Sequence, residues 1–76
     1  MNGYEQHQQQ RLALLKVLYA AREAQPDKGW VTLAQLRDAA GPGEFALAYL
    51  EERGHVAKSG FSYRITASGI DAVEAA

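Results

Sequence analysis

The sequence lacks cysteine, and it has no long hydrophobic run. Without cysteine there is no disulfide framework and no thiolate chemistry. No apolar run approaches the length that crosses a bilayer, and residues 1–10 carry none of the hydrophobic stretch of an export signal. We therefore expect a cytoplasmic protein without a membrane partner.

A surplus of positive charge is also missing. Eight Lys and Arg residues face nine Asp and Glu residues, which gives a net charge of −1 and a pI near 6.0. Domains that bind nucleic acid usually carry a basic surplus, because neutralising phosphates supplies much of their affinity. The overall charge thus argues against strong nonspecific DNA binding, although it leaves room for a local basic patch.

Groups that could perform catalysis are few. The chain has two histidines, His7 and His55, and neither has neighbours at metal-ligand spacing. The adjacent Glu51 and Glu52 diverge around a helix, so they do not form a paired-carboxylate site. The glycines of "GPG" and "SG" are typical of turns. We expect no enzyme, no metal and no cofactor.

What is present fits one small domain over residues 1–76, with residues 1–7 frayed. Residues 5–24 predict a first helix, because Leu12, Leu15 and Tyr19 recur at helical spacing. This helix ends at the loop that contains proline.

The clearest local signal is "WVTLAQL". Thr32 and Gln35 form a capping box, which predicts a second helix over residues 33–40. The residues before the cap are expected to be extended, with Trp30 as a core plug between the first helix and the hairpin. Gly41 is expected to end the helix in a left-handed conformation.

The third helix is expected over residues 42–53, with Pro42 in its opening turn and Gly54 at its end. Helical periodicity predicts a core-facing side and an opposite, outward side for this helix. The expected core contacts join Ala46, Leu47 and Leu50 to Leu12, Leu15, Leu18 and Leu36.

A hairpin follows in "HVAKSGFSYRIT", with its turn at Ser59-Gly60. Strand alternation is expected to place Phe61, Tyr63 and Ile65 on one face and Ser62 and Arg64 on the other. A last short helix starts after Thr66.

The expected fold class is α+β, mainly α: a three-helix core with a short β-hairpin wing and a short C-terminal helix. The segment "YLEERGHVAKSGFSYRITASGID" resembles the pattern LE-x-RG-x-V, hairpin, IT-x-x-G of winged helix-turn-helix proteins. The resemblance is to small bacterial and phage-type members that are similar to multiple-antibiotic-resistance-type regulators, and it covers about residues 25–75. It implies that the outward side of the third helix reads DNA and that the wing meets the DNA backbone.

The residues expected to bind DNA or a partner are Glu44, Phe45, Ala48, Tyr49 and Glu52 on the third helix and Lys58, Ser59, Gly60 and Arg64 on the hairpin. The helix residues are poor base readers, since direct readout relies mostly on Arg, Lys, Asn and Gln. Three interpretations of Phe45 and Tyr49 stay open: packing into the core, an exposed patch for a partner, or base reading.

The resemblance makes a DNA-binding transcriptional regulator the first expectation, with duplex DNA as its partner and Lys58 and Arg64 as phosphate contacts. Such a small module would need to form a homodimer, through the first helix of residues 5–24 and the last helix. The alternative is a protein–protein interaction module that uses the outward side of the third helix.

Overall fold

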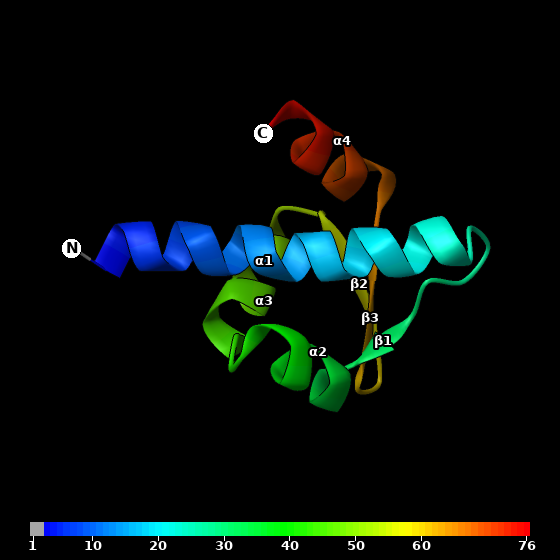
Figure 1. Cartoon of the computed structure of the whole chain (residues 1–76), viewed down its shortest axis with the longest axis horizontal. Helices are drawn as coiled ribbons and strands as arrows, with labels where there is room; N and C mark the ends of the chain where they lie inside the picture. Colours follow the sequence, from blue (N-terminus) through cyan, green and yellow to red (C-terminus); the bar gives the residue numbers. More distant parts are fainter. Residues whose placement is uncertain (1–2) are drawn as a thin grey trace.

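The computed structural model describes residues 3–76. Its elements, in chain order, are α1 (Gly3–Ala24), β1 (Val31–Thr32), α2 (Leu33–Ala40), α3 (Glu44–Glu52), β2 (Val56–Ser59), β3 (Ser62–Ile65) and α4 (Ala67–Ala75) (Figure 1). The chain is mainly helical and has a small antiparallel sheet in the order β1-β3-β2. The α+β, mainly α class is thus confirmed. No helix within residues 3–76 is both long enough and apolar enough to cross a membrane.

Two helix starts differ from expectation. Helix α1 begins at Gly3, so residues 3–7, which were expected to be frayed, are helical, while residues 1 and 2 lie outside the described part. Helix α3 begins at Glu44 rather than at residue 42, because Pro42 and Gly43 form the connection from α2. A glycine suits this position, since a Cβ atom would lie 2.8 Å from Leu14 Cδ1 and that side chain would have to shift.

The predicted cap of α2 is confirmed. The Gln35 amide donates to Thr32 Oγ1 at 3.2 Å, and the Thr32 amide donates to Gln35 Oε1 at 3.0 Å. Gly41 ends the helix with φ 81° as expected, but its ψ of 177° is extended rather than left-handed helical. The chain therefore leaves α2 in an extended path toward α3.

The hairpin turn lies one residue later than expected. Ser59 pairs with Ser62, so the two central residues are Gly60 and Phe61. Gly60 has φ 61°, and no non-glycine residue in the described chain has positive φ, which matches a type II′ turn. Phe61 is consequently 81% exposed in the turn and does not share the core face of Tyr63, so its predicted placement is wrong.

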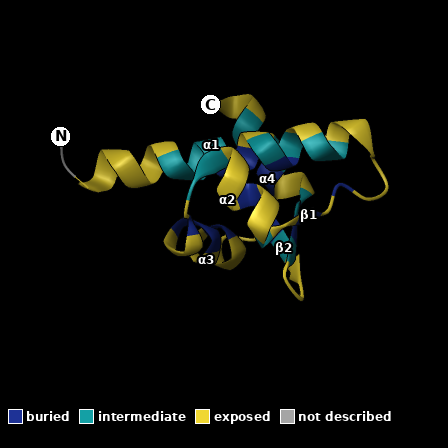
Figure 2. Ribbon diagram, turned by 60° about the horizontal axis from the view of Figure 1, so that its bottom comes forward, coloured by how far each residue is buried: buried dark blue, intermediate teal, exposed yellow. Residues whose placement is uncertain are grey.

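The core lies where α1, α2, α3 and the sheet meet (Figure 2). Its members are Leu14, Leu15, Leu18, Val31, Leu36, Ala46, Leu47, Leu50, Val56, Tyr63 and Ile65. Leu12 was expected to be a core residue, but its side chain is only half-buried. Leu14 is fully buried instead. Each buried leucine stabilises the fold by about 1.5–3 kcal/mol.

Trp30 is not a core plug, since it is 42% exposed. Val31, the next residue, points into the core, and successive side chains of an extended segment point to opposite faces. Trp30 therefore lies on the outer face of the sheet, where its ring centroid is 6.0 Å from the Arg64 guanidinium carbon.

Helix α4 packs against α1 and β3, on the side of α1 opposite α2 and α3 (Figure 1). The Gly69 amide donates to Thr66 Oγ1 at 3.2 Å, which caps the helix. The Tyr19 hydroxyl of α1 donates to Glu74 Oε2 at 2.9 Å near the other end of α4. The pKa of Tyr19 is raised, chiefly by this hydrogen bond to Glu74 and secondly by the negative charge of that carboxylate.

Candidate interaction surface on α3 and the hairpin

The predicted binding residues divide between two elements. Glu44, Phe45, Ala48, Tyr49 and Glu52 are all exposed on α3, as are Lys58, Ser59 and Gly60 at the hairpin, whereas Arg64 is half-buried. The structure thus leaves most of the predicted set accessible.

The two aromatic side chains of α3 are not part of the core. Phe45 is 67% exposed and Tyr49 is 38% exposed, whereas Leu47 and Leu50 are at most 2% exposed. The alternative in which these rings fold back to complete the core is therefore wrong. They are surface groups on the side of α3 that lies away from the core.

These rings face the N-terminal half of α1. The ring centroids of His7 and Phe45 lie 4.4 Å apart, and the Arg11 guanidinium carbon lies 4.3 Å from the Tyr49 ring centroid. The second contact has the geometry of a cation–π interaction. Sequence reasoning missed the α1 partners. The available signal was spacing: His7 and Arg11 are four residues apart, as are Phe45 and Tyr49, which puts each of these two pairs on one face of its own helix.

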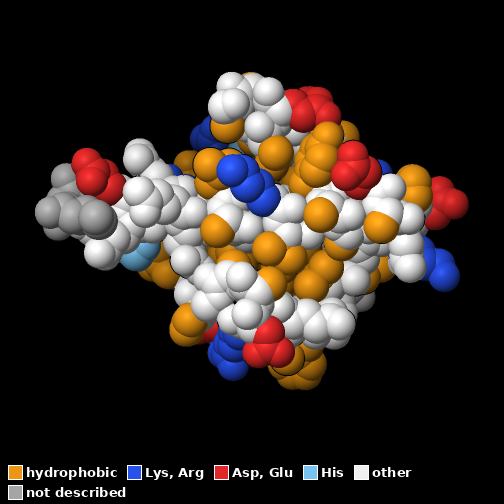
Figure 3. Space-filling view, viewed as in Figure 1, with side chains coloured by type: hydrophobic (Ala, Val, Ile, Leu, Met, Phe, Trp, Pro, Cys, Tyr) orange, Lys and Arg blue, Asp and Glu red, His pale blue; other side chains and the backbone are white. Residues whose placement is uncertain are grey.

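Together with neighbouring side chains these four residues line a shallow groove. This α1–α3 groove has a volume of ≈ 410 Å³ and is lined by Tyr4, His7, Gln8, Arg11, Phe45 and Tyr49. Tyr4 is 79% exposed at its outer end. In Figure 3 a histidine side chain borders hydrophobic side chains beneath the N-terminal part of α1. The groove therefore brings three exposed aromatic rings together with a guanidinium and an imidazole.

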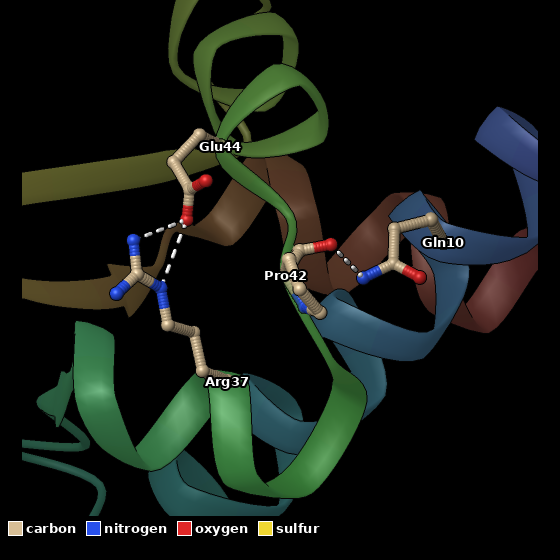
Figure 4. Close-up of polar contacts among 4 residues, drawn as sticks. All are labelled: Gln10, Arg37, Pro42 and Glu44. Carbon is tan, nitrogen blue, oxygen red and sulfur yellow. Dashed lines mark hydrogen bonds and ion pairs between the residues drawn. The ribbon is translucent and has the colours of Figure 1, made fainter.

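The connection between α2 and α3 is held from both sides (Figure 4). Arg37 donates through Nε and Nη2 to Glu44 Oε1, at 3.0 and 2.9 Å. Gln10 Nε2 donates to the carbonyl oxygens of Ala40 at 2.9 Å and Pro42 at 3.1 Å. The ion pair is more than half exposed on both partners, so it stabilises the fold by about 0–1 kcal/mol. Its main consequence is that Arg37, which sequence reasoning missed, offsets the charge of Glu44.

The two hairpin cations do not form one patch. Ala57 pairs with Arg64 across the hairpin, and Lys58 pairs with Tyr63. Side chains paired in this way share a face, and adjacent residues point to opposite faces. Tyr63 faces the core, so Lys58 lies on the side of the sheet that α1 and α3 cover, while Arg64 lies with Trp30 on the outer face.

The described residues show no grouping that could ligate a metal ion. Within residues 3–76, no three His, Cys, Asp or Glu side chains gather in a way that could hold a metal ion. His55 Nδ1 lies 3.0 Å from Ser68 Oγ, which ties the start of the hairpin to α4. On the face seen in Figure 3, Lys and Arg side chains are separated rather than gathered in a basic patch.

Comparisons with known proteins add no relative. No protein-family model matches the chain, no curated protein matches it in sequence, and no solved structure matches it in fold. The functional argument therefore depends on the residues and geometry described above.

Proposed function

We propose that this chain is a winged-helix domain that works as a protein-interaction module through the α1–α3 groove. Support for the winged-helix assignment comes from the order of elements. Helices α2 and α3 are joined by a short turn, and a hairpin follows whose inner strand β3 also pairs with β1. The same order underlies the sequence resemblance to that superfamily.

The observation that carries the interaction proposal is the exposure of clustered aromatic rings. Tyr4, Phe45 and Tyr49 are 79%, 67% and 38% exposed and lie along one groove with Arg11. Protein interfaces are enriched in Tyr, Phe and Arg, and these residue types dominate binding energy when a partner covers them. Exposed rings gathered in this way favour a protein partner.

The chemistry of α3 also weighs against base reading. Its exposed side offers no Arg, Lys, Asn or Gln between Glu44 and Glu52, and these four types make most base-specific contacts. Exposed Glu51 and Glu52 would face phosphates and oppose binding to a polyanion.

Peptide display tests the proposal. We expect panning against the immobilised chain to select peptides that no longer bind Phe45→Glu. Phe61→Glu is the matched control, because Phe61 is equally aromatic and 81% exposed but lies in the hairpin turn. Selected peptides should bind this control unchanged. Loss of binding in both variants, or in neither, would contradict the proposal.

A second candidate function is duplex DNA binding of the regulatory type. One observation favours it: Lys58 lies on the same side of the sheet as α3, so the hairpin and helix could face one duplex together. Fluorescence anisotropy with duplex DNA tests this candidate. If the chain binds duplex DNA in this way, binding should be detected at low ionic strength. It should weaken when salt is added and in the Lys58→Ala variant. Absence of binding at low ionic strength would eliminate it.

A further inference from the structure

We infer that the α1–α3 groove binds a second copy of this chain, groove against groove, with α1 of each copy facing α3 of the other. The inference rests on the proposed function and names its partner. The two walls of the groove, formed by α1 and α3, carry side chains that can contact each other across two copies of the chain.

The first support is the projecting end of α1. A helix of 22 residues is about 33 Å long, which is most of the 38 Å longest dimension of the molecule. Residues 3–9 are all exposed, and this end extends past α2 and α3 (Figure 1). Helical turns with so little tertiary burial are marginal in water. A second copy that covers these turns would stabilise them.

The second support is charge complementarity between the two walls. The α1 wall contributes the positive charge of Arg11, while the exposed charge on the aromatic side of α3 is Glu52. Glu52 is seven residues after Phe45 and three after Tyr49, which places the three on one helix face. When α1 faces α3 of the second copy, Arg11 meets Glu52 across the interface.

The third support is that the groove contains both partners of each proposed contact, so two copies of the same surface can bind each other. Twofold dimers bury the same patch on both subunits. Here the patch holds two exposed rings on α3, a third on α1 and a guanidinium that already lies over one of them. Facing copies would place the rings of one groove against the rings and guanidinium of the other. This arrangement buries aromatic surface that the monomer leaves in water.

Sedimentation equilibrium tests the inference first. We expect the wild-type chain to form dimers reversibly as its concentration rises toward about 1 mM, a range that includes weak specific association. Phe45→Glu should weaken the dimer about tenfold or more, as loss of a central interface aromatic does. Position 45 is exposed and lies in the first turn of α3, where an acidic residue is favourable, so this variant should fold. Phe61→Glu, which adds the same charge in the hairpin turn, should dimerise like the wild type.

A charge exchange then identifies the pairing. Arg11→Glu and Glu52→Arg chains should each be monomeric where the wild type dimerises, and circular dichroism should show that both are folded. Mixed in equal amounts, the two variants should recover the dimer. In the mixed dimer one Arg–Glu contact is restored with its charges reversed, and the other has its original charges, so no like-charge contact remains. A wild type that stays monomeric, or a mixture that stays monomeric, would overturn the inference.

These outcomes are separable from failure of the proposed function. A monomer that still selects peptides through Phe45 would refute the second copy as partner and leave the interaction module intact. A chain that selects no peptides but dimerises through the groove would retain the groove as an interface and identify its use as self-association.

Discussion

The two ends of α1 have opposite surroundings. Toward its C-terminus, α4 and the sheet cover the helix: Tyr19 bonds Glu74, and Arg22 Nη1 donates to the Ile65 carbonyl at 2.8 Å. Toward its N-terminus, residues 3–9 are exposed, and the rings of Phe45 and Tyr49 from α3 lie beside the helix. The C-terminal end of α1, the closed end, is thus held by hydrogen bonds to other elements of the domain. The N-terminal end, the open end, has the residue types of an interface, which is why we propose that the functional surface lies there.

The largest expected effect lies between the two ends, on the buried side of α3. Leu50→Ala should lower the free energy of unfolding by about 2–5 kcal/mol, because Leu50 is 1% exposed and its truncation leaves a cavity. Urea unfolding followed by circular dichroism measures this loss. A loss below about 1 kcal/mol would mean that α3 is not held by its inner face as described.

The next effect belongs to the closed end. In Gly69→Ala the new Cβ would meet the His55 carbonyl oxygen and lie 2.6 Å from Ile65 Cγ1, so α4 must shift away from the hairpin. We expect a loss of about 1–3 kcal/mol in unfolding free energy, typical of overpacking. The urea midpoint measures it, and Gly3→Ala is the control because no atom lies within 4 Å of a Cβ there. Equal midpoints for the two variants would show that α4 is not closely docked.

A smaller, pH-dependent effect should also appear at the closed end. The raised pKa of Tyr19 means that the folded chain holds the phenol proton more tightly than the unfolded chain does. Its stabilisation is therefore fully present below the ordinary tyrosine pKa of about 10 and is lost as pH rises through the raised value. Urea midpoints of wild type and Tyr19→Phe should differ near neutral pH and converge in strong alkali. A constant difference across that range would argue against the Tyr19–Glu74 bond.

The smallest effect on stability should come from the open end. Phe45→Ala should change the unfolding free energy by no more than about 0.5 kcal/mol, because surface substitutions rarely do more and Phe45 is 67% exposed. The same urea experiment measures it beside Leu50→Ala. A loss comparable to that of Leu50→Ala would show that Phe45 is a core residue and would break the comparison between the two ends.

Much of this fold could be predicted from local sequence chemistry. The cap at Thr32 is confirmed because both of its hydrogen bonds join residues three apart in the chain. The inner face of α3 follows from helical periodicity alone, and its leucines are buried as expected. Errors arose where long-range packing decides. Trp30 and Phe61 are large and apolar, yet the register of the sheet places one on the outer face and the other in a turn.

The candidate site was predictable in part for the same reason. The exposed residues of α3 follow from its periodicity, but their partners on α1 lie more than thirty positions away in the chain. Similarly, the sequence alone suggested that Lys58 and Arg64 could contact phosphates together, whereas the strand register places them on opposite faces of the sheet. Sequence spacing predicts which residues share an element, whereas only tertiary structure shows which elements share a surface.

The central claim is that the aromatic side of α3 is an interaction surface and not a DNA-reading one. An amide chemical-shift titration with duplex DNA at low ionic strength tests it most directly. We predict no specific shifts over residues 44–52, even if the hairpin around Lys58 responds weakly. Saturable shifts at Phe45, Ala48 and Tyr49 that weaken with added salt would contradict the claim and restore base reading by α3.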